Sequence, residues 1–328
     1  MNRFLTALCA ATGIASPALA ASPLDSTFAS APPAPLWALQ VPSGSGPVAQ
    51  FTNDRLEISF PDSSSGSVFG AGLVSSCQLS GDFDVAAEYV LLDWPGANGV
   101  RTGLYVGGAV ERTSFSTWTW NDFPGEPREV YLTNFSDGVQ GIVETADLAG
   151  KLRLVRAGTA LTGLYQTATG WAPIHTGPVV TDDLAIYLSA WSHDNVFIRQ
   201  PVRMAFTSFQ VLSGRVVCGG AVLVPVDVKP GSVANPIKVT SNGTTPVAIL
   251  TSDALDASTI DPTTVTVAGA LAAQAALEDV NGDGLLDLVV HVETGAMSLP
   301  PGTTYVEVDG AIVGGGRFVG WDRVTLLP

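Results

Sequence analysis

Residues 55–60 of this 328-residue chain read RLEISF, and this short stretch indicates the kind of fold. Successive side chains of an extended strand point to opposite faces, so Leu56, Ile58 and Phe60 share one face of a strand. The same alternation returns, between clusters of turn-forming residues, in residues 82–92 (DFDVAAEYVLL), 151–158 (KLRLVRAG) and 202–212 (VRMAFTSFQVL). Strands with one polar face predict antiparallel sheets that pack together as a sandwich.

The composition agrees with a protein made of strands. The chain contains 35 Gly and 22 Pro, 46% of its residues are hydrophobic, and no convincing amphipathic helix is visible. Its length favours two domains, and glycines and prolines break the strand pattern near residue 220. We therefore predict an all-β protein with a β-sandwich over residues 36–214, a linker over 215–224 and a small immunoglobulin-like β-sandwich over 225–328.

The N-terminal residues 1–20 have the pattern of a secretory signal peptide. Arg3 precedes an apolar run, and a small-residue ALA motif stands before Ala21. We therefore expect a secreted protein, extracellular or periplasmic, in which residues 21–35 form a flexible lead-in. No other apolar run is long enough to span a membrane.

The charge narrows the range of partners. The formal net charge is −15 and becomes −16 when the segment that contains Arg3 is removed. Such a chain repels nucleic acid and anionic membranes, and it favours divalent cations.

Cys77 and Cys218 are the cysteines that remain after residues 1–20 are removed. An oxidising compartment permits a disulfide between them. It would close a loop of roughly 140 residues (218 minus 77), for which loop-closure entropy gives on the order of 5 kcal/mol. Two buried free thiols are the alternative, because spacing alone does not establish the geometry of a bridge.

Two segments resemble known families. Residues 81–107 (GDFDVAAEYVLLDWPGANGVRTGLYVG), followed by YLTNF, GKLRLVRAGTALTGLY and LSAWSHDN, resemble the concanavalin A-like or laminin G-like sandwich of bacterial exported proteins. This resemblance implies a jelly-roll sandwich for the first domain. Residues 226–269, together with EDVNGDGLLDLVVH at 278–291, resemble a small C-terminal module of secreted bacterial proteins. The central loop of that module is similar to the calcium loops of FG-GAP repeats and, less closely, of dockerins. The second resemblance implies no activity.

The loop at residues 279–287 (DVNGDGLLD) predicts a calcium site, because calcium prefers several oxygen ligands in a flexible arrangement. The expected ligands recur at alternate positions: the side chains of Asp279, Asn281, Asp283 and Asp287, with the backbone carbonyl of Leu285. Position twelve is Val290, so the bidentate glutamate of an EF-hand is missing. The alternative is a hairpin turn whose aspartates cap backbone groups. The repulsion among three aspartates favours a bound cation.

Patterns that suggest catalysis are weak. Sandwich hydrolases need two carboxylates about 5 to 9 Å apart, and no E-x-D-x-x-E pattern occurs. The pairs Asp82/Asp84 and Glu126/Glu129 are interpreted as solvent-facing residues near turns. Ser192, His193 and Asp194 are consecutive, so they point to alternating faces and do not predict a catalytic triad.

A cluster of aromatic residues suggests a binding surface. Trp118 and Trp120 are two positions apart, so they share a face of a strand and could stack on sugar rings, with Asn121 and Arg112 bonding to the hydroxyl groups. The alternative is that the two tryptophans pack between the sheets. We expect Trp94, Trp171 and Trp191 to lie in the core.

These patterns together predict a secreted protein without catalytic activity. Its lectin-like sandwich would bind carbohydrate or another extracellular partner, and calcium would stabilise its C-terminal module. The alternatives are a glycan hydrolase or lyase with an unrecognised site, and a structural or adhesive surface component.

Overall fold

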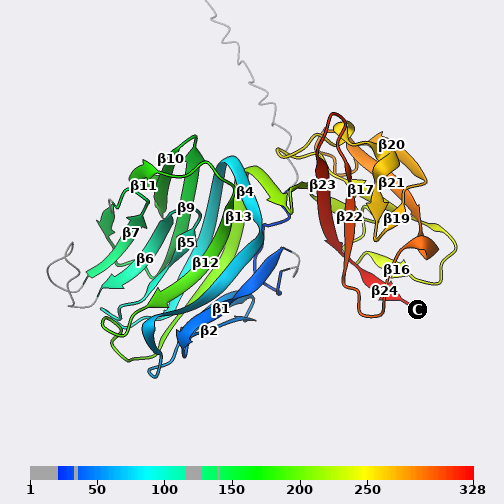
Figure 1. Cartoon of the computed structure of the whole chain (residues 1–328). Helices are drawn as coiled ribbons and strands as arrows, with labels where there is room; N and C mark the ends of the chain where they lie inside the picture. The colour runs from blue at the N-terminus through cyan, green and yellow to red at the C-terminus, as the bar shows by residue number, and fades with distance from the viewer. Residues whose placement is uncertain (1–20, 33–35, 116–127, 139–140) are drawn as a thin grey trace, which may run out of the picture.

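The computed structural model describes residues 21–32, 36–115, 128–138 and 141–328, and these form two sandwiches of β-sheets (Figure 1). The prediction of an all-β sandwich protein is confirmed. The predicted signal peptide lies outside the described residues. No helix among the described ranges is long and apolar enough to cross a membrane.

The larger sandwich consists of two antiparallel sheets. We name the first the groove sheet. Its strands, in spatial order, are β1 (Trp37–Ser45), the first half of β4 (Ser65–Asp93), β12 (Leu184–Ser192), β5 (Arg101–Tyr105), β6 (Ala109–Phe115), β7 (Arg128–Asn134) and β8 (Ile142–Glu144).

We name the second the back sheet. Its strands, in spatial order, are β2 (Val48–Thr52), β3 (Arg55–Phe60), β13 (Val202–Cys218), the second half of β4, β9 (Ala149–Ala157), β10 (Ala160–Thr167) and β11 (Gly170–Pro178). Strand β4 is 29 residues long and runs from one sheet into the other.

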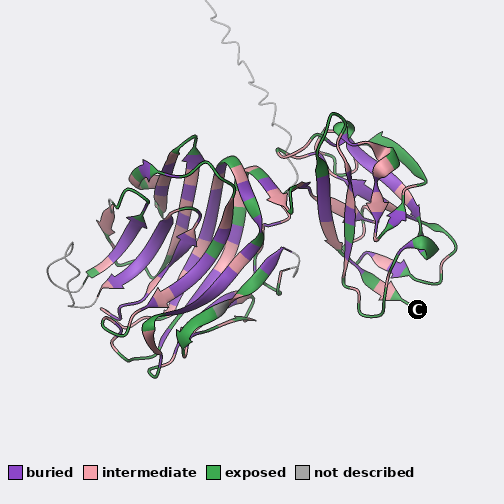
Figure 2. Ribbon diagram, in the orientation of Figure 1, coloured by how far each residue is buried: buried purple, intermediate pink, exposed green. Residues whose placement is uncertain are grey.

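The apolar faces of the two sheets meet in one core. Leu56, Ile58 and Phe60 of the RLEISF stretch are at most 1% exposed, as their alternation predicts. Burying a side chain of this size contributes about 1.5 to 3 kcal/mol. Figure 2 shows the same alternation as purple and lighter bands along the strands of the larger sandwich.

The prediction of a flexible lead-in is wrong for residues 24–28. Leu24 and Phe28 are buried in the core of the larger sandwich. Ser26 forms a β-bridge with Phe209, and the Asp25 carboxylate accepts a hydrogen bond from the Val211 amide at 2.8 Å. The segment lacks a periodic pattern because it is anchored by single side chains rather than by a full strand.

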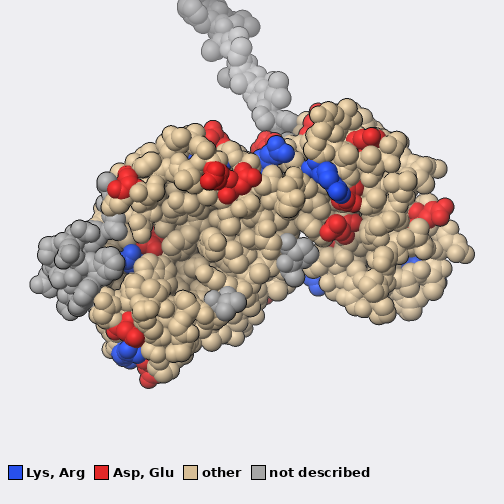
Figure 3. Space-filling view, in the orientation of Figure 1, with Lys and Arg blue, Asp and Glu red and all other residues tan. Residues whose placement is uncertain are grey.

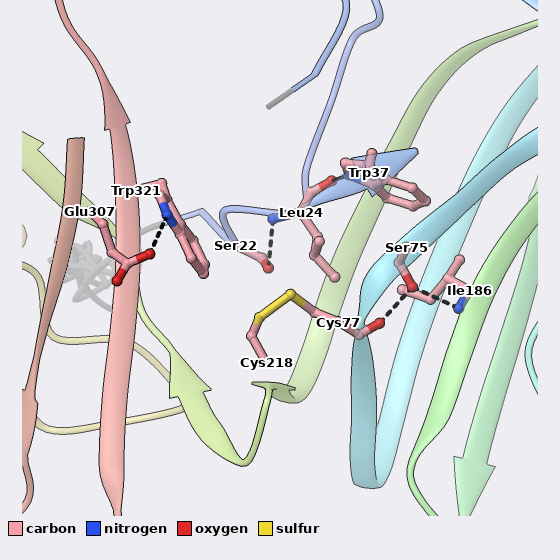
Figure 4. The surroundings of a disulfide bond; sticks show 9 residues. All are labelled: Ser22, Leu24, Trp37, Ser75, Cys77, Ile186, Cys218, Glu307 and Trp321. Atoms are coloured by element: carbon pink, nitrogen blue, oxygen red, sulfur yellow. Dashed lines mark hydrogen bonds between the residues drawn. A yellow bond between two sulfur atoms is a disulfide. The ribbon is translucent and has the colours of Figure 1, made fainter. Parts of the chain in front are cut away.

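The disulfide that the sequence left open is present and joins Cys77 to Cys218 (Figure 4). It links β4 to the end of β13, beside Leu24 and Trp37. The Cys77 carbonyl accepts a hydrogen bond from Ser75 Oγ at 2.6 Å, which holds this part of β4 in place.

The predicted linker at residues 215–224 consists largely of strand. Residues 215–218 complete β13, and β14 (Ala221–Leu223) pairs with β13 on one side and with β23 (Arg317–Arg323) on the other. Leu223 belongs to the core of the larger sandwich, whereas Val222 belongs to the core of the smaller one. The two sandwiches are therefore joined by backbone hydrogen bonds as well as by the covalent chain.

The smaller sandwich packs two sheets around an aliphatic core. One sheet has the order β15 (Val226–Val228), β17 (Thr244–Ile249), β21 (Asp287–Glu293) and β20 (Gln274–Glu278). The other runs from β14 through β23, β22 (Tyr305–Ala311) and β18 (Thr266–Val267) to β19 (Ala270–Leu271). The remaining elements are the pair β16 (Pro236–Lys238) and β24 (Thr325–Leu327) and the short 3-10 helices η1 (Ala257–Thr259), η2 (Pro262–Thr264) and η3 (Thr294–Ala296).

Candidate functional site

A groove of about 400 Å³ lies on the outer face of the groove sheet, and four neighbouring strands line it. Its walls contain Tyr187, Trp191 and Tyr105, and its polar groups come from Gln40, Ser43 and Ser189. The volume lies within the range that small-ligand sites in proteins occupy.

The strand register explains why the sheet is hollow at this point. Ser189 of β12 stands opposite Gly72 of β4 on one side and Gly103 of β5 on the other. Residues directly opposite one another point to the same face, so Ser189 has no side chain beside it on either neighbouring strand. A Cβ at Gly72 would lie 2.4 Å from the Leu188 carbonyl oxygen and 2.6 Å from Ser189 Oγ. Glycine is thus required at Gly72, and it leaves a pit in the sheet.

A polar pair forms the floor of this pit. Ser189 Oγ donates a hydrogen bond to Gln40 Oε1 at 2.8 Å, across Gly72. The bond leaves the Gln40 amide nitrogen as a donor beside the groove. The floor can therefore offer hydrogen bonds to oxygen atoms of a ligand.

Trp191 forms one wall and is fixed by a chain of contacts. Its Nε1 donates to Tyr105 Oη at 2.7 Å, and that hydroxyl donates to Glu111 Oε1, also at 2.7 Å. The guanidinium of Arg101 lies 4.8 Å from the centre of the Trp191 ring and 3.8 Å from Glu111 Oε2. Trp191 has a neighbour on each adjacent strand of the sheet. Arg101 lies opposite it on β5, and Gly70, which lines the groove, lies opposite it on β4. One side of the indole thus contacts Arg101, and the other side adjoins the groove.

Glu111 supports the wall from below. Its side chain is 1% exposed, and its Oε2 atom accepts no hydrogen bond from the described residues. The charge of Glu111 is balanced by Arg101, its ion-pair partner. Burial, followed by the adjacent Glu111 carboxylate, raises the pKa of Tyr105 well above its usual value. Tyr105 is therefore a neutral phenol that holds both Trp191 and Glu111.

The groove itself is uncharged. None of its lining residues is Asp, Glu, Lys, Arg or His. In Figure 3 the middle of the visible face of the larger sandwich is hollowed and mostly tan, while acidic side chains gather along its upper rim. Aromatic walls, a polar floor and no charge form a site suited to an uncharged ligand with both apolar and hydroxyl-bearing faces.

The predicted carbohydrate-binding residues lie elsewhere or outside the described part of the chain. Trp118, Trp120 and Asn121 are not among the described residues. Arg112 does not meet the expectation of sugar contact, because it is 1% exposed on the inner face of β6. Its guanidinium donates to the Glu129 carboxylate at 2.7 Å and to the Thr113 and Asp147 carbonyl oxygens.

Two further sequence interpretations need correction. Glu129, interpreted as solvent-facing, accepts hydrogen bonds from Arg112, from Trp94 and from Ser114. Trp191, expected in the core, is half-buried and lines the groove. The alternation of Tyr187, Ser189 and Trp191 on one strand face is the signal that could have revealed this wall, but alternation does not tell which face is outside.

The serine, histidine and aspartate at positions 192–194 bond to different groups, as their alternation predicts. Ser192 Oγ donates to the Gly99 carbonyl at 2.7 Å, His193 Nδ1 lies 2.7 Å from the Ser67 carbonyl, and Asp194 pairs with Arg199.

The loop predicted to bind calcium folds around its own backbone amides. Asp279 accepts hydrogen bonds from Gly282 and Gly284, Asn281 from Asp283, and Asp283 from the Leu285 amide. Asp287 is completely buried and accepts from Thr251 and Val280. Among the described residues, no three Asp, Glu, His or Cys side chains are grouped as metal ligands.

The oxygen donors of this loop nevertheless suit a hard cation. Burial raises the pKa of Asp287, and the nearby carboxylates of Asp283 and Asp279 raise it further. The Asp287 carboxylate is thus close enough to Asp279 and Asp283 to be affected by their negative charges, which a divalent cation would neutralise. Calcium binding stays a prediction.

Comparisons with known proteins agree on no family. Neither a protein-family model nor a curated protein matches the chain. Similar solved structures include the exoplasmic/lumenal domain of VIP36 in a Ca²⁺- and Man2-bound form, with 11% identity, a TM-score of 0.41 and coverage of 58% of this chain and 87% of that one. A β-1,3-glucanase from Mycobacterium marinum has 11% identity, a TM-score of 0.38 and coverage of 57% and 97%. A Bacillus licheniformis β-glucanase has 9% identity, a TM-score of 0.40 and coverage of 58% and 97%.

Proposed function

We propose that this protein is a secreted, non-catalytic carbohydrate-binding protein whose ligand occupies the groove beside Trp191. The observation that carries the proposal is the fixed indole wall next to an uncharged polar floor. The apolar C–H face of a sugar ring packs on an aromatic side chain, and its hydroxyl groups bond to residues such as Gln40 and Ser189.

Rigidity is the property that makes this wall suitable for binding. A side chain that is already ordered loses little conformational entropy when a ligand arrives. Tyr105, Glu111 and Arg101 supply that order to Trp191, because each contacts the indole or the group that bonds to it.

The arrangement of carboxylates supports a role in binding rather than in hydrolysis. On the outer face of the groove sheet, the described strands carry Glu111 on β6 and Glu144 on β8, with β7 between them. Glu111 is in register with Leu132 of β7 and Ile142 of β8, and Glu144 lies two residues beyond Ile142. The Cα atoms of Glu111 and Glu144 are therefore about 12 Å apart. Glu144 is 75% exposed and pairs with Arg128. Glycoside hydrolysis needs two carboxyl groups about 5 to 9.5 Å apart on either side of the bond that breaks.

Calcium is the second part of the proposal. Asp279, Asn281, Asp283 and Asp287, with the Leu285 carbonyl, would hold the ion, and the ion would neutralise their charges and order the loop. Its role would be stability of the smaller sandwich, because the loop precedes β21, a strand that contributes to that core.

The test of carbohydrate binding is retention on a panel of immobilised polysaccharides, with and without Trp191→Ala. We expect retention by the native protein and its loss in the variant. Trp171→Ala is the matched control, because Trp171 lies on β11 of the back sheet, away from the groove. Absence of binding to every glycan would overturn the proposal. Release of reducing sugar or of unsaturated products by purified protein would show an enzyme instead.

A further inference from the structure

The floor of the groove restricts the ligand more narrowly than carbohydrate in general. We infer that the groove selects uncharged saccharides over anionic ones, and that Gln40 and Ser189 determine this selectivity. The inference rests on the proposed function and concerns the same site.

The first argument is the absence of a cation at the floor. A carboxylate or sulfate on a sugar is bound in proteins by Arg or Lys, whose charge replaces the water that the anion loses. The nearest guanidinium known at this wall, that of Arg101, is paired with Glu111 and stacked on the Trp191 ring. It is not among the residues that line the groove, so it is not offered to the ligand.

The second argument concerns the buried carboxylate. Glu111 is on the same sheet face as Ser189, with only Gly103 between them. A Cβ at Gly103 would lie 3.0 Å from Glu111 Cγ, so the Glu111 side chain lies close over this glycine. Glu111 and Arg101 form an ion pair at 3.8 Å, so their charges offset each other and this buried pair supplies no free cation to an anionic ligand at the floor.

The third argument is the hydrogen-bonding pattern of the floor. Ser189 Oγ donates to Gln40 Oε1, which leaves an amide N–H group and the lone pairs of a hydroxyl toward the ligand. Such a pair both donates and accepts hydrogen bonds, which matches a sugar hydroxyl. A carboxylate only accepts, so it would leave the Ser189 lone pairs without a donor.

The overall charge acts in the same direction. The formal net charge is −15, and it lowers the concentration of polyanions near the protein. Selectivity would therefore come from two sources, the floor residues of the groove and the net charge of the whole protein. Substitution of a floor residue changes the first source far more than the second.

The experiment compares neutral polysaccharides with the same polymers after oxidation of their C6 hydroxymethyl groups to carboxylates. Soluble glucan, mannan and galactan serve as probes, and dissociation constants are measured by calorimetry at 0.15 M salt. We expect oxidation to weaken binding by at least about tenfold, which corresponds to about 1.4 kcal/mol. Gln40→Lys should reduce or reverse that ratio, because it places a cation at the floor.

Glu293→Gln is the control, because it changes the net charge by the same amount at an exposed position on β21 of the smaller sandwich. It should leave the ratio almost unchanged. Equal or tighter binding of the oxidised polymer, lost in Trp191→Ala, would overturn the inference and leave the proposed function intact. Failure of both forms of every polymer to bind would overturn the proposed function, and the inference with it. A ratio that Glu293→Gln changes as much as Gln40→Lys would show that net charge alone causes the preference, and would also overturn the inference.

Discussion

The two sandwiches have the same kind of architecture but keep their polar groups in different places. The larger one buries charged side chains that stand on its strands. Examples are Glu111, Arg112 and Arg156, which are each at most 2% exposed. The smaller one has a core of aliphatic side chains with Phe318, and its buried carboxylate, Asp287, stands where a loop meets a strand.

This difference follows from the size of the sheets. In a wide sheet, a residue such as Trp191 has a neighbouring strand on each side. On one side it lies next to Arg101, which pairs with Glu111, and on the other side it lies next to a glycine, Gly70. Narrow sheets leave few positions with two neighbours, so polar chemistry moves to the connecting loops. A binding groove is therefore expected in the larger sandwich and a stabilising ion in the smaller one.

Removal of the disulfide should produce the largest difference in stability between the two sandwiches, because it should destabilise only the larger one. The bridge spans 141 residues of the larger sandwich, so loop-closure entropy gives a loss on the order of 5 kcal/mol for Cys77→Ser with Cys218→Ser. Denaturant unfolding followed by tryptophan fluorescence should show an early transition of the larger sandwich. Equal displacement of the transitions of both sandwiches would contradict this prediction.

The buried ion pair should be nearly as important for the larger sandwich. Arg112→Met leaves the Glu129 carboxylate without its cation, and breaking a buried pair costs about 3 to 5 kcal/mol. Arg128→Met is the control, because Arg128 is 46% exposed and its pair with Glu144 contributes at most about 1 kcal/mol. The difference in unfolding free energy between the two variants is the measurement. Similar values would show that burial of Arg112 has little energetic consequence.

Calcium should stabilise only the smaller sandwich. At a concentration 100 times the dissociation constant, binding to the folded state contributes about 2.7 kcal/mol. Calorimetry of the full chain with calcium or with chelator should show a shift of one transition. Asp283→Asn should abolish the shift, whereas Glu293→Gln, outside the loop, should retain it. A transition that calcium leaves unmoved in the native protein would exclude the proposed site.

The smallest of these effects is a pH dependence of the stability of the larger sandwich, which Asp25 of the N-terminal segment should cause. Burial raises the pKa of Asp25 from 3.8 to about 6. The folded state then binds the proton more tightly than the unfolded state does, so this group's contribution to stability rises as pH falls from 7 through 6 toward 4. Asp25→Asn should remove a change of about 1 to 3 kcal/mol. Identical melting temperatures against pH for both proteins would refute this assignment.

Much of the fold could be predicted from local patterns, but little of the site could. Alternation correctly predicted the buried face of Leu56, Ile58 and Phe60, and the cysteine count allowed the bridge that the structure contains. The anchoring of Leu24 and Phe28 was missed because single buried side chains leave no periodic signal. Glu111 was missed because nothing near it in the sequence suggests a role, and its partners Tyr105 and Arg101 come from another strand, β5.

The amino-acid sequence by itself determined the strand content, the division into two sandwiches and the oxygen-rich loop at residues 279–287, because each depends on residues that are close in the chain. Only the tertiary structure decided that Trp191 faces outward, that Gly72 and Gly103 flank Ser189, and that Glu111 lies beneath the wall. The physical reason is that strand register, which brings together residues far apart in sequence, is set by the packing of whole sheets.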